Sequence, residues 1–109
     1  MDQKSLALEY FLRFSCKDIG ALSRMFAEGI CLRDWENQAL GKEKVLEVYE
    51  KIFASVDQIS VTPGFLYEDG DTVIAELLIS IDGKERILVT DILQFTDDNK
   101  IVGVRAYKG

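Results

Sequence analysis

The stretch VIAELLISIDGKERILVTDILQF, residues 73–95, decides the fold class of this chain. Apolar side chains occupy every second position from Val73 to Ile81, which is the period of a β-strand rather than of a helix. Asp82 and Gly83 follow directly, and this dipeptide is a strong signal for a tight hairpin turn. The remainder of the stretch is again rich in β-branched and apolar residues, so the sequence predicts two antiparallel strands joined by that turn.

Two further strands flank this hairpin. Residues 101–107, after a turn at 97–99, predict the last strand, and residues 59–67 predict the strand before the hairpin. Pro63, the only proline of the chain, marks an edge position or a bulge in that earlier strand, because proline cannot donate to a sheet ladder. The C-terminal half is therefore predicted to be an antiparallel meander.

Three helices are predicted before the meander. Apolar residues at helical spacing predict a largely buried helix over residues 5–15, and Asp18 is suited to cap a second, short helix that ends at Gly29. Residues 30–35 predict a strand. Gly41 then opens a third helix, whose apolar side chains recur at helical spacing: Val45, Tyr49, Ile52 and Val56. Helices followed by a meander indicate an α+β fold, with the helices packed on one face of a curved sheet.

Composition bounds the class of protein. The chain has 109 residues, of which 48% are hydrophobic, and a net charge of −6, which suits one domain spanning residues 1–109. Its acidic balance offers little counterion release to a polyanion, so no nucleic-acid partner is expected. No apolar run approaches the ~18 residues of a membrane span, and the N-terminal residues do not resemble a signal peptide. We therefore expect a cytoplasmic protein with no membrane partner.

The absence of histidine restricts the available chemistry. It removes the commonest general base and every histidine-containing catalytic triad or metal site, so proton transfer must use Asp, Glu, Tyr, Lys or Cys. No metal ion is expected, because the acidic turns lack the spacing of a calcium loop. No cofactor is expected either, because Gly20, Gly41 and Gly64 form no phosphate-binding cluster. Cys16 and Cys31 are expected to be buried, reduced thiols, with one disulfide between them as the alternative.

Two acids and a tyrosine lie where the pattern calls for apolar side chains. Asp34 continues the apolar face of the strand before it, Asp91 shares the apolar face of the strand at 85–95, and Tyr10 lies on the apolar stripe of the first helix. Two inward acids in an apolar cavity are candidates for acid–base chemistry, because burial makes such groups retain a proton. The structural alternative is that Asp34 ends its strand in solvent, Asp91 pairs with Arg105, and Tyr10 is a core residue.

The register of the hairpin decides which way Asp91 points. A regular turn at Asp82 and Gly83 places Asp91 opposite Ile74, on the face that also carries Glu76. A bulge before Asp91 would instead keep the two apolar faces together. The sequence leaves both registers open, and Glu76 is either a second acid of the pocket or a cross-strand partner of a Lys or Arg.

Four segments, in this order of elements, carry a family resemblance: MFA at 25–27, GKE at 41–43, VTDILQF at 89–95 and IVGVRAY at 101–107. Together they resemble the nuclear transport factor 2-like superfamily, in its SnoaL-like branch, over almost the whole chain. The resemblance implies a cone-shaped, curved and mostly antiparallel sheet, with the three N-terminal helices packed on its concave face.

Within that superfamily, the candidate site is similar to that of ketosteroid isomerase, a well-known example of an aspartic acid kept neutral by apolar surroundings. The resemblance implies that Asp34 is a general base, and that Tyr10 and a protonated Asp91 donate hydrogen bonds to an oxyanion. It also implies a supporting or pocket role for four further residues: Phe26, Trp35, Tyr49 and Glu76. Of these, Tyr49 matches a tyrosine that hydrogen-bonds the oxyanion-hole tyrosine.

The chain also departs from the isomerases. The loop from Asp34 to Gly41 is shorter, Trp35 replaces a proline, and Lys108 stands where some isomerases have a pocket tryptophan. These departures imply a smaller or differently shaped pocket than one for a steroid.

Three functions fit these residues. The first is an enzyme that moves a proton next to a carbonyl group of a small apolar molecule, through an enolate, in an isomerisation, cyclisation or dehydration. The second is a protein that binds a small apolar ligand without catalysis, and the third is a dimerisation module. A two-fold homodimer through the sheet is expected, because the last three strands carry apolar residues on both faces while helices cover only one.

Overall fold

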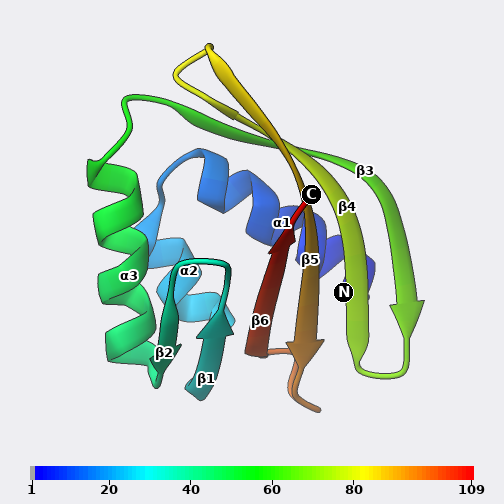
Figure 1. Ribbon diagram of the computed structural model, residues 1–109. Helices are drawn as coiled ribbons and strands as arrows, with labels where there is room; N and C mark the ends of the chain where they lie inside the picture. The colour runs from blue at the N-terminus through cyan, green and yellow to red at the C-terminus, as the bar shows by residue number, and fades with distance from the viewer. Residues whose placement is uncertain (1) are drawn as a thin grey trace.

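The structure, a computed structural model, describes residues 2–109 and contains three helices and six strands (Figure 1). The helices precede most of the sheet, and their bounds are α1 (Gln3–Ser15), α2 (Ile19–Met25) and α3 (Lys42–Ala54). The strands are β1 (Phe26–Arg33), β2 (Gln38–Leu40), β3 (Ile59–Asp69), β4 (Thr72–Ile81), β5 (Glu85–Phe95) and β6 (Ile101–Lys108).

The six strands form one curved, unclosed sheet in the order β2-β1-β6-β5-β4-β3. Strands β1 and β6 are parallel, and the other neighbours pair in antiparallel fashion. The long strands β3 and β4 bend over α1, and the helices lie on the concave side of the sheet (Figure 1). The predicted α+β fold, with a mostly antiparallel sheet and three helices on one face, is confirmed.

The hairpin between β4 and β5 settles the direction of Asp91. Ile81 pairs with Glu85, so the turn contains Asp82, Gly83 and Lys84 rather than two residues. The added residue brings Asp91 opposite Ala75 on the inward face. A regular two-residue turn is therefore wrong, and no bulge interrupts β5 before Asp91, because the turn itself supplies the shift.

Strand β3 shows why its proline is tolerated. It is an edge strand, and its register against β4 shifts between Pro63 and Leu66. Pro63 therefore marks both an edge and a bulge, the two positions at which a missing N–H costs a sheet little.

Two boundaries differ from the expectations. Helix α2 ends at Met25, because the backbone of Phe26 is already extended and begins β1, so Gly29 lies inside a strand. Helix α3 ends at Ala54, before Val56. The three-residue strand β2 has too little sequence for a detectable period and was not expected.

The prediction that both cysteines are buried is wrong. Cys16 and Cys31 are both free and exposed. Cys16 lies just beyond the last residue of α1, where that helix reaches the surface. Cys31 points outward between the inward-facing Ile30 and Leu32, as the alternation of side chains along a strand requires.

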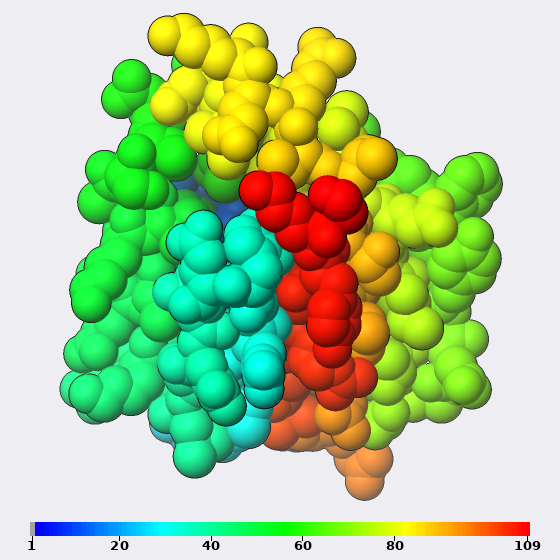
Figure 2. All heavy atoms as spheres, in the orientation of Figure 1, coloured from blue at the N-terminus to red at the C-terminus, as the bar shows by residue number. Residues whose placement is uncertain are grey.

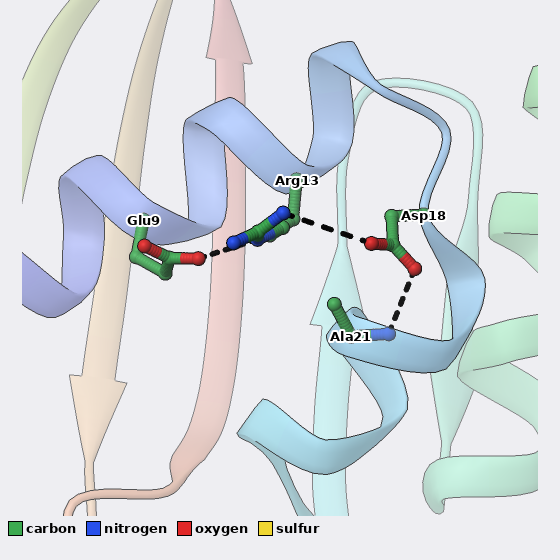
Figure 3. Close-up of polar contacts among 4 residues, drawn as sticks. All are labelled: Glu9, Arg13, Asp18 and Ala21. Carbon is green, nitrogen blue, oxygen red and sulfur yellow. Dashed lines mark hydrogen bonds and ion pairs between the residues drawn. The ribbon is translucent and has the colours of Figure 1, made fainter.

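An ion-pair cluster joins the first two helices (Figure 3). Arg13 of α1 pairs with Glu9 one turn earlier and lies 3.8 Å, Nη1 to Oδ2, from Asp18. The other carboxylate oxygen of Asp18 accepts a hydrogen bond of 3.0 Å from the backbone N–H of Ala21. Asp18 therefore caps α2 as predicted, and Arg13 anchors the cap to α1.

Candidate active site

A cavity of about 270 Å³ lies between the helices and the concave face of the sheet. Figure 2 shows its mouth as a hollow bounded by α3, the β1–β2 turn and the β4–β5 hairpin, with atoms of α1 at its floor. Most of its wall is aliphatic, from the end of α3 and the inward faces of the strands: Leu32, Ile52, Val56, Ile59, Val61, Leu77, Ile79, Ile81, Ile87, Val89, Val104 and Ala106.

Four predicted polar residues meet in this cavity. Tyr10 comes from α1, Tyr49 from α3, Asp91 from β5, and Asp34 from the residue just after β1. They are separated by as much as 81 positions in sequence, counted from Tyr10 to Asp91, and only the closure of the helices onto the sheet brings them together. A small group of polar side chains inside an apolar wall is the usual composition of a small-molecule site.

The two tyrosines form the polar core of the cavity. Their hydroxyl oxygens are 2.6 Å apart and share one hydrogen bond. Both side chains are buried, and burial is the main cause that raises the pKa of each phenol above its usual value of 10.0. Two hydroxyls carry two protons and their mutual bond uses one, so the pair keeps one O–H for a ligand.

Packing fixes the position of this pair. The Tyr49 ring makes edge contacts with Phe14, Phe26 and Phe53, at centroid distances of 5.6, 5.6 and 6.2 Å. The Tyr10 ring packs on Phe26 at 6.4 Å. Phe26 therefore supports both tyrosines from behind, although it does not line the cavity.

Apart from the two tyrosines, Asp91 is the one buried polar or charged side chain of residues 2–109, with 8% of its surface exposed. Burial, and then the nearby charge of Asp34, raise the pKa of Asp91 from 3.8 to about 7. Within the described residues its carboxyl group forms no hydrogen bond or ion pair, and Arg105 is exposed on the opposite face. The alternative that Asp91 pairs with Arg105 is therefore wrong, and the carboxyl group is free to contact a ligand.

Asp34 is held by the turn that follows it. Its Oδ1 accepts hydrogen bonds from the backbone N–H of Glu36 at 2.8 Å and of Asn37 at 2.6 Å. The side-chain amide of Asn37 lies 3.2 Å from each carboxylate oxygen. These donors orient the carboxylate, and Oδ2, with only the longer contact, is the oxygen less engaged by the protein.

Asn37 is a site residue that the sequence reasoning missed. It lines the cavity as well as contacting Asp34. The available signal was the spacing Asp34-x-x-Asn37, because an aspartate that begins a tight turn accepts backbone N–H groups two and three residues later.

Trp35 lies in the wall of the cavity and is 43% exposed. The Nζ of Lys108, from the end of β6, lies 6.0 Å from the centre of its ring, within the range of a cation–π contact. Lys108, which stands where some isomerases have a pocket tryptophan, therefore lies over the ring of Trp35.

Glu76 is not brought to the site. It pairs with Thr90 on the outward face of the sheet, is exposed, and forms no ion pair within residues 2–109. It is neither a pocket acid nor, in this structure, an ion-pair partner for a neighbouring strand.

Across residues 2–109, no three Cys, Asp or Glu side chains are grouped as a metal ion would need. None of the helices in that range is long and apolar enough to cross a membrane.

The family of the chain follows from this fold and a sequence comparison. A model of the SnoaL-like domain matches residues 7–104, so the chain belongs to the SnoaL-like family, which has the nuclear transport factor 2-like fold. No curated protein matches the chain in sequence.

Several solved structures share the fold. The epoxide hydrolase/cyclase-like enzyme SalBIII, of pyran ring formation in the polyether salinomycin, superposes with a TM-score of 0.85 at 21% identity, over 98% of this chain and 90% of that one. A protein of Kribbella flavida, provisionally named a ketosteroid isomerase, superposes with a TM-score of 0.85 at 16% identity, over 98% of this chain and 77% of that one. A provisionally named polyketide cyclase of Sinorhizobium meliloti superposes with a TM-score of 0.84 at 19% identity, over 97% of this chain and 99% of that one. At these identities the likeness establishes the fold.

Proposed function

We propose that this protein is an acid–base enzyme that moves a proton at a carbon next to a carbonyl group of a small apolar molecule. The observation that carries the proposal is one apolar cavity with a buried carboxyl group of pKa about 7 beside a hydrogen-bonded tyrosine pair, and a second carboxylate on the cavity wall. When the surroundings of two titratable groups separate their pKa values, one group usually serves as the acid and the other as the base.

In the proposed reaction, Asp34 is the base. A carboxylate oxygen of Asp34 takes the proton from carbon, and the electron pair of the broken C–H bond moves to form the enolate. Tyr10 and protonated Asp91 donate hydrogen bonds to the carbonyl oxygen as its negative charge develops. Asp34 then returns its proton to the same carbon or to another, or a further bond forms at the enolate.

The tyrosines suit the donor task. Tyr10, whose pKa burial raises further above the usual 10.0, carries its phenolic proton at neutral pH. Tyr49 fixes the Tyr10 hydroxyl at 2.6 Å, so little reorganisation is needed when the oxyanion forms. The mostly apolar wall lowers the local dielectric, which strengthens each of these hydrogen bonds.

The cavity limits the substrate. Its volume of about 270 Å³ lies just below the ~300–1,000 Å³ of ordinary ligand pockets. The aliphatic lining favours an apolar ring or chain, with one carbonyl group at the tyrosine end. The names of two structural relatives, an isomerase and a cyclase, support enolate chemistry as the reaction class.

The proposal also includes a cytoplasmic location. Cys16 and Cys31 are free and exposed, and exposed thiols persist most readily in a reducing compartment.

The activity is tested with a panel of small enones and β-keto compounds. The wild-type protein should turn over at least one of them, and Asp34→Asn should lose about 100-fold or more of that rate, because the amide cannot accept the proton. Asp97→Asn, in an exposed turn far along the chain, is the matched control and should retain the wild-type rate. Equal background rates for the wild type and Asp34→Asn on every compound would contradict the proposal.

A second candidate, ligand binding without catalysis, is favoured by one observation. The Oδ1 of Asp34 is already occupied by three N–H donors from Glu36 and Asn37, as in a carboxylate that only shapes a turn. A binding protein predicts that an apolar ketone raises the melting temperature of the wild type and Asp34→Asn equally, with no turnover by either.

A further inference from the structure

The wall of the cavity carries acidic side chains and no basic ones. Asp34, Glu36 and Asp91 all line it, whereas none of the Lys and Arg residues in the range 2–109 does. The Nζ of Lys108 lies 6.0 Å from the centre of the Trp35 ring, but within this range Lys108 forms no ion pair with any of the three acids. The cavity is therefore a negatively charged site whenever its carboxyl groups are ionised.

The surroundings of Asp91 supply no counter-charge. Its side chain is only 8% exposed, and across residues 2–109 its carboxyl group has no hydrogen-bond or ion-pair partner. The neighbouring strands place Ala75 and Ala106 beside it, and the helices add Tyr10 and Tyr49. Neither an alanine nor a protonated phenol neutralises a carboxylate. Because a buried charge without a partner is costly, a cation in the cavity would be stabilised beside it.

Aromatic rings complete the surroundings of such a cation. Five of them line the cavity: Tyr10, Phe11, Phe14, Trp35 and Tyr49. The face of an aromatic ring attracts a cation, and groups of such rings recognise ammonium ligands in other proteins. The aliphatic remainder of the wall suits a hydrocarbon body. The cavity volume of about 270 Å³ exceeds the ~150 Å³ that can hold a benzene ring, so the cavity can accept one ring with a short arm.

We propose that this cavity binds a small apolar amine as its ammonium ion, with the cation held by Asp91 and Asp34 and the hydrocarbon part against the aliphatic wall. The ligand enters through the mouth shown in Figure 2. An alkylammonium keeps its own proton below ~pH 10, so it brings a full positive charge. The proposal concerns binding alone and does not rest on the enolate chemistry. An amine in this place excludes a carbonyl substrate, and so acts as a competitive inhibitor of the proposed reaction.

Binding of the ammonium ion is coupled to the proton of Asp91, because the cation pairs only with the ionised carboxyl group. Burial and the charge of Asp34 raise the pKa of Asp91 to about 7. The other titratable groups that face Asp91 are Tyr10 of α1 and Tyr49 of α3, whose pKa values are raised above 10.0 and which stay neutral. The affinity for the amine is therefore constant above pH 7 and falls by up to about tenfold for each pH unit below it. A carbonyl ligand that accepts a hydrogen bond from protonated Asp91 has the opposite dependence.

Isothermal titration calorimetry with cyclohexylmethylamine tests the proposal, and cyclohexylmethanol is the neutral reference ligand. At ~pH 8.5 the wild type should bind the amine about 10-fold or more tightly than the alcohol. The affinity for the amine should fall by about 30-fold between ~pH 8.5 and ~5.5. At ~pH 6 the amine should displace about 0.9 proton for each molecule bound, read from titrations in two buffers of different ionisation enthalpy, whereas the alcohol should displace none.

Asp91→Asn keeps the shape of the side chain and removes its charge. At ~pH 8.5 this variant should bind the amine about 10-fold or more weakly than the wild type, lose most of the pH dependence, and keep its affinity for the alcohol within about twofold. Asp97→Asn, in an exposed turn, changes the net charge of the chain by the same amount and should bind the amine like the wild type. Thermal melts show that both variants fold, and the proton release of the wild type does not depend on them.

Three results would overturn the proposal. The first is an amine that binds the wild type no more tightly than the alcohol at ~pH 8.5, and the second is amine binding that displaces no proton at ~pH 6. The third is equal affinity of the wild type and folded Asp91→Asn for the amine. None of these readings needs turnover, so their outcome is separate from that of the activity tests.

Discussion

Burial and the charge of Asp34 raise the pKa of Asp91 to about 7, so both the protonated and the ionised form of this carboxyl group are present near neutral pH. Only the protonated form can donate a hydrogen bond. The stability of the fold is therefore expected to depend on pH in the physiological range.

The free energy of unfolding should record this titration. The folded protein holds the Asp91 proton up to about pH 7, whereas the unfolded chain releases it near ~pH 4, so the stabilisation is fully present below ~pH 4 and is lost as the pH rises to ~7. Asp91→Asn does not titrate. Compared with that variant, the free energy of unfolding of the wild type should fall by up to about 4 kcal/mol as the pH rises from ~4 to ~7.

Urea unfolding of both proteins at several pH values measures the difference. Asp34→Asn is the control, because removing the neighbouring charge should end the window at a lower pH. A difference between the wild type and Asp91→Asn that stays constant from ~pH 4 to ~8 would contradict the buried position of this carboxyl group.

The tyrosine pair gives a second prediction at this scale. Tyr49→Phe removes a hydroxyl that is hydrogen-bonded at 2.6 Å and leaves the buried Tyr10 hydroxyl without that partner, so the free energy of unfolding should fall by about 1–3 kcal/mol. Tyr67→Phe, which removes an exposed hydroxyl, should change it by less than ~0.5 kcal/mol. Equal losses in urea unfolding would mean that the buried bond is not formed.

The sequence predicted which polar side chains would reach the cavity better than it predicted their immediate partners. Tyr10, Tyr49, Asp34 and Asp91 all reach one cavity, because inward direction follows from the periods of helix and strand. Glu76 does not reach it, because the direction of a strand residue depends on a register that is set by the turn.

At the scale of the elements, the sequence predicted the start of a helix correctly where a single residue type determines the local backbone. Asp18 caps α2 through the N–H of Ala21, and Gly41, with φ of 91°, precedes α3 in a conformation that favours glycine. The turn length at Asp82–Lys84 was not predictable from the dipeptide alone. The Asp82 side chain accepts bonds from the backbone N–H groups of Asp57 and Gln58, so a distant connection helps to hold this turn.

Helix α2 is short and depends on its cap. Asp18→Ala removes the hydrogen bond to the Ala21 N–H and the contact with Arg13 shown in Figure 3, so the free energy of unfolding should fall by about 0.5–2 kcal/mol. Asp97→Ala alters an exposed turn residue whose side chain forms no hydrogen bond within residues 2–109 and should have little effect. If the Asp18 cap did not stabilise α2, Asp18→Ala and Asp97→Ala would unfold with the same midpoint.

At the scale of the whole molecule, the two faces of the sheet differ. The concave face and the helices enclose the cavity, and the convex face carries exposed apolar side chains. The fold class followed from the order of the elements, because helices before a meander have few ways to bury their apolar faces. The shape of the cavity did not follow in the same way, because part of its wall comes from the irregular turn after β1, at Trp35, Glu36 and Asn37.

The central claim is that Asp34 removes a proton from carbon inside this cavity. The exchange of protons for deuterium next to the carbonyl group of small apolar ketones in D2O, followed by proton NMR, tests it without assuming any later step. The account predicts that the wild type accelerates exchange on at least one ketone, and that Asp34→Asn slows this exchange by about 100-fold or more while Asp97→Asn does not. Exchange at the buffer rate with the wild type, or equal acceleration by Asp34→Asn, would contradict it.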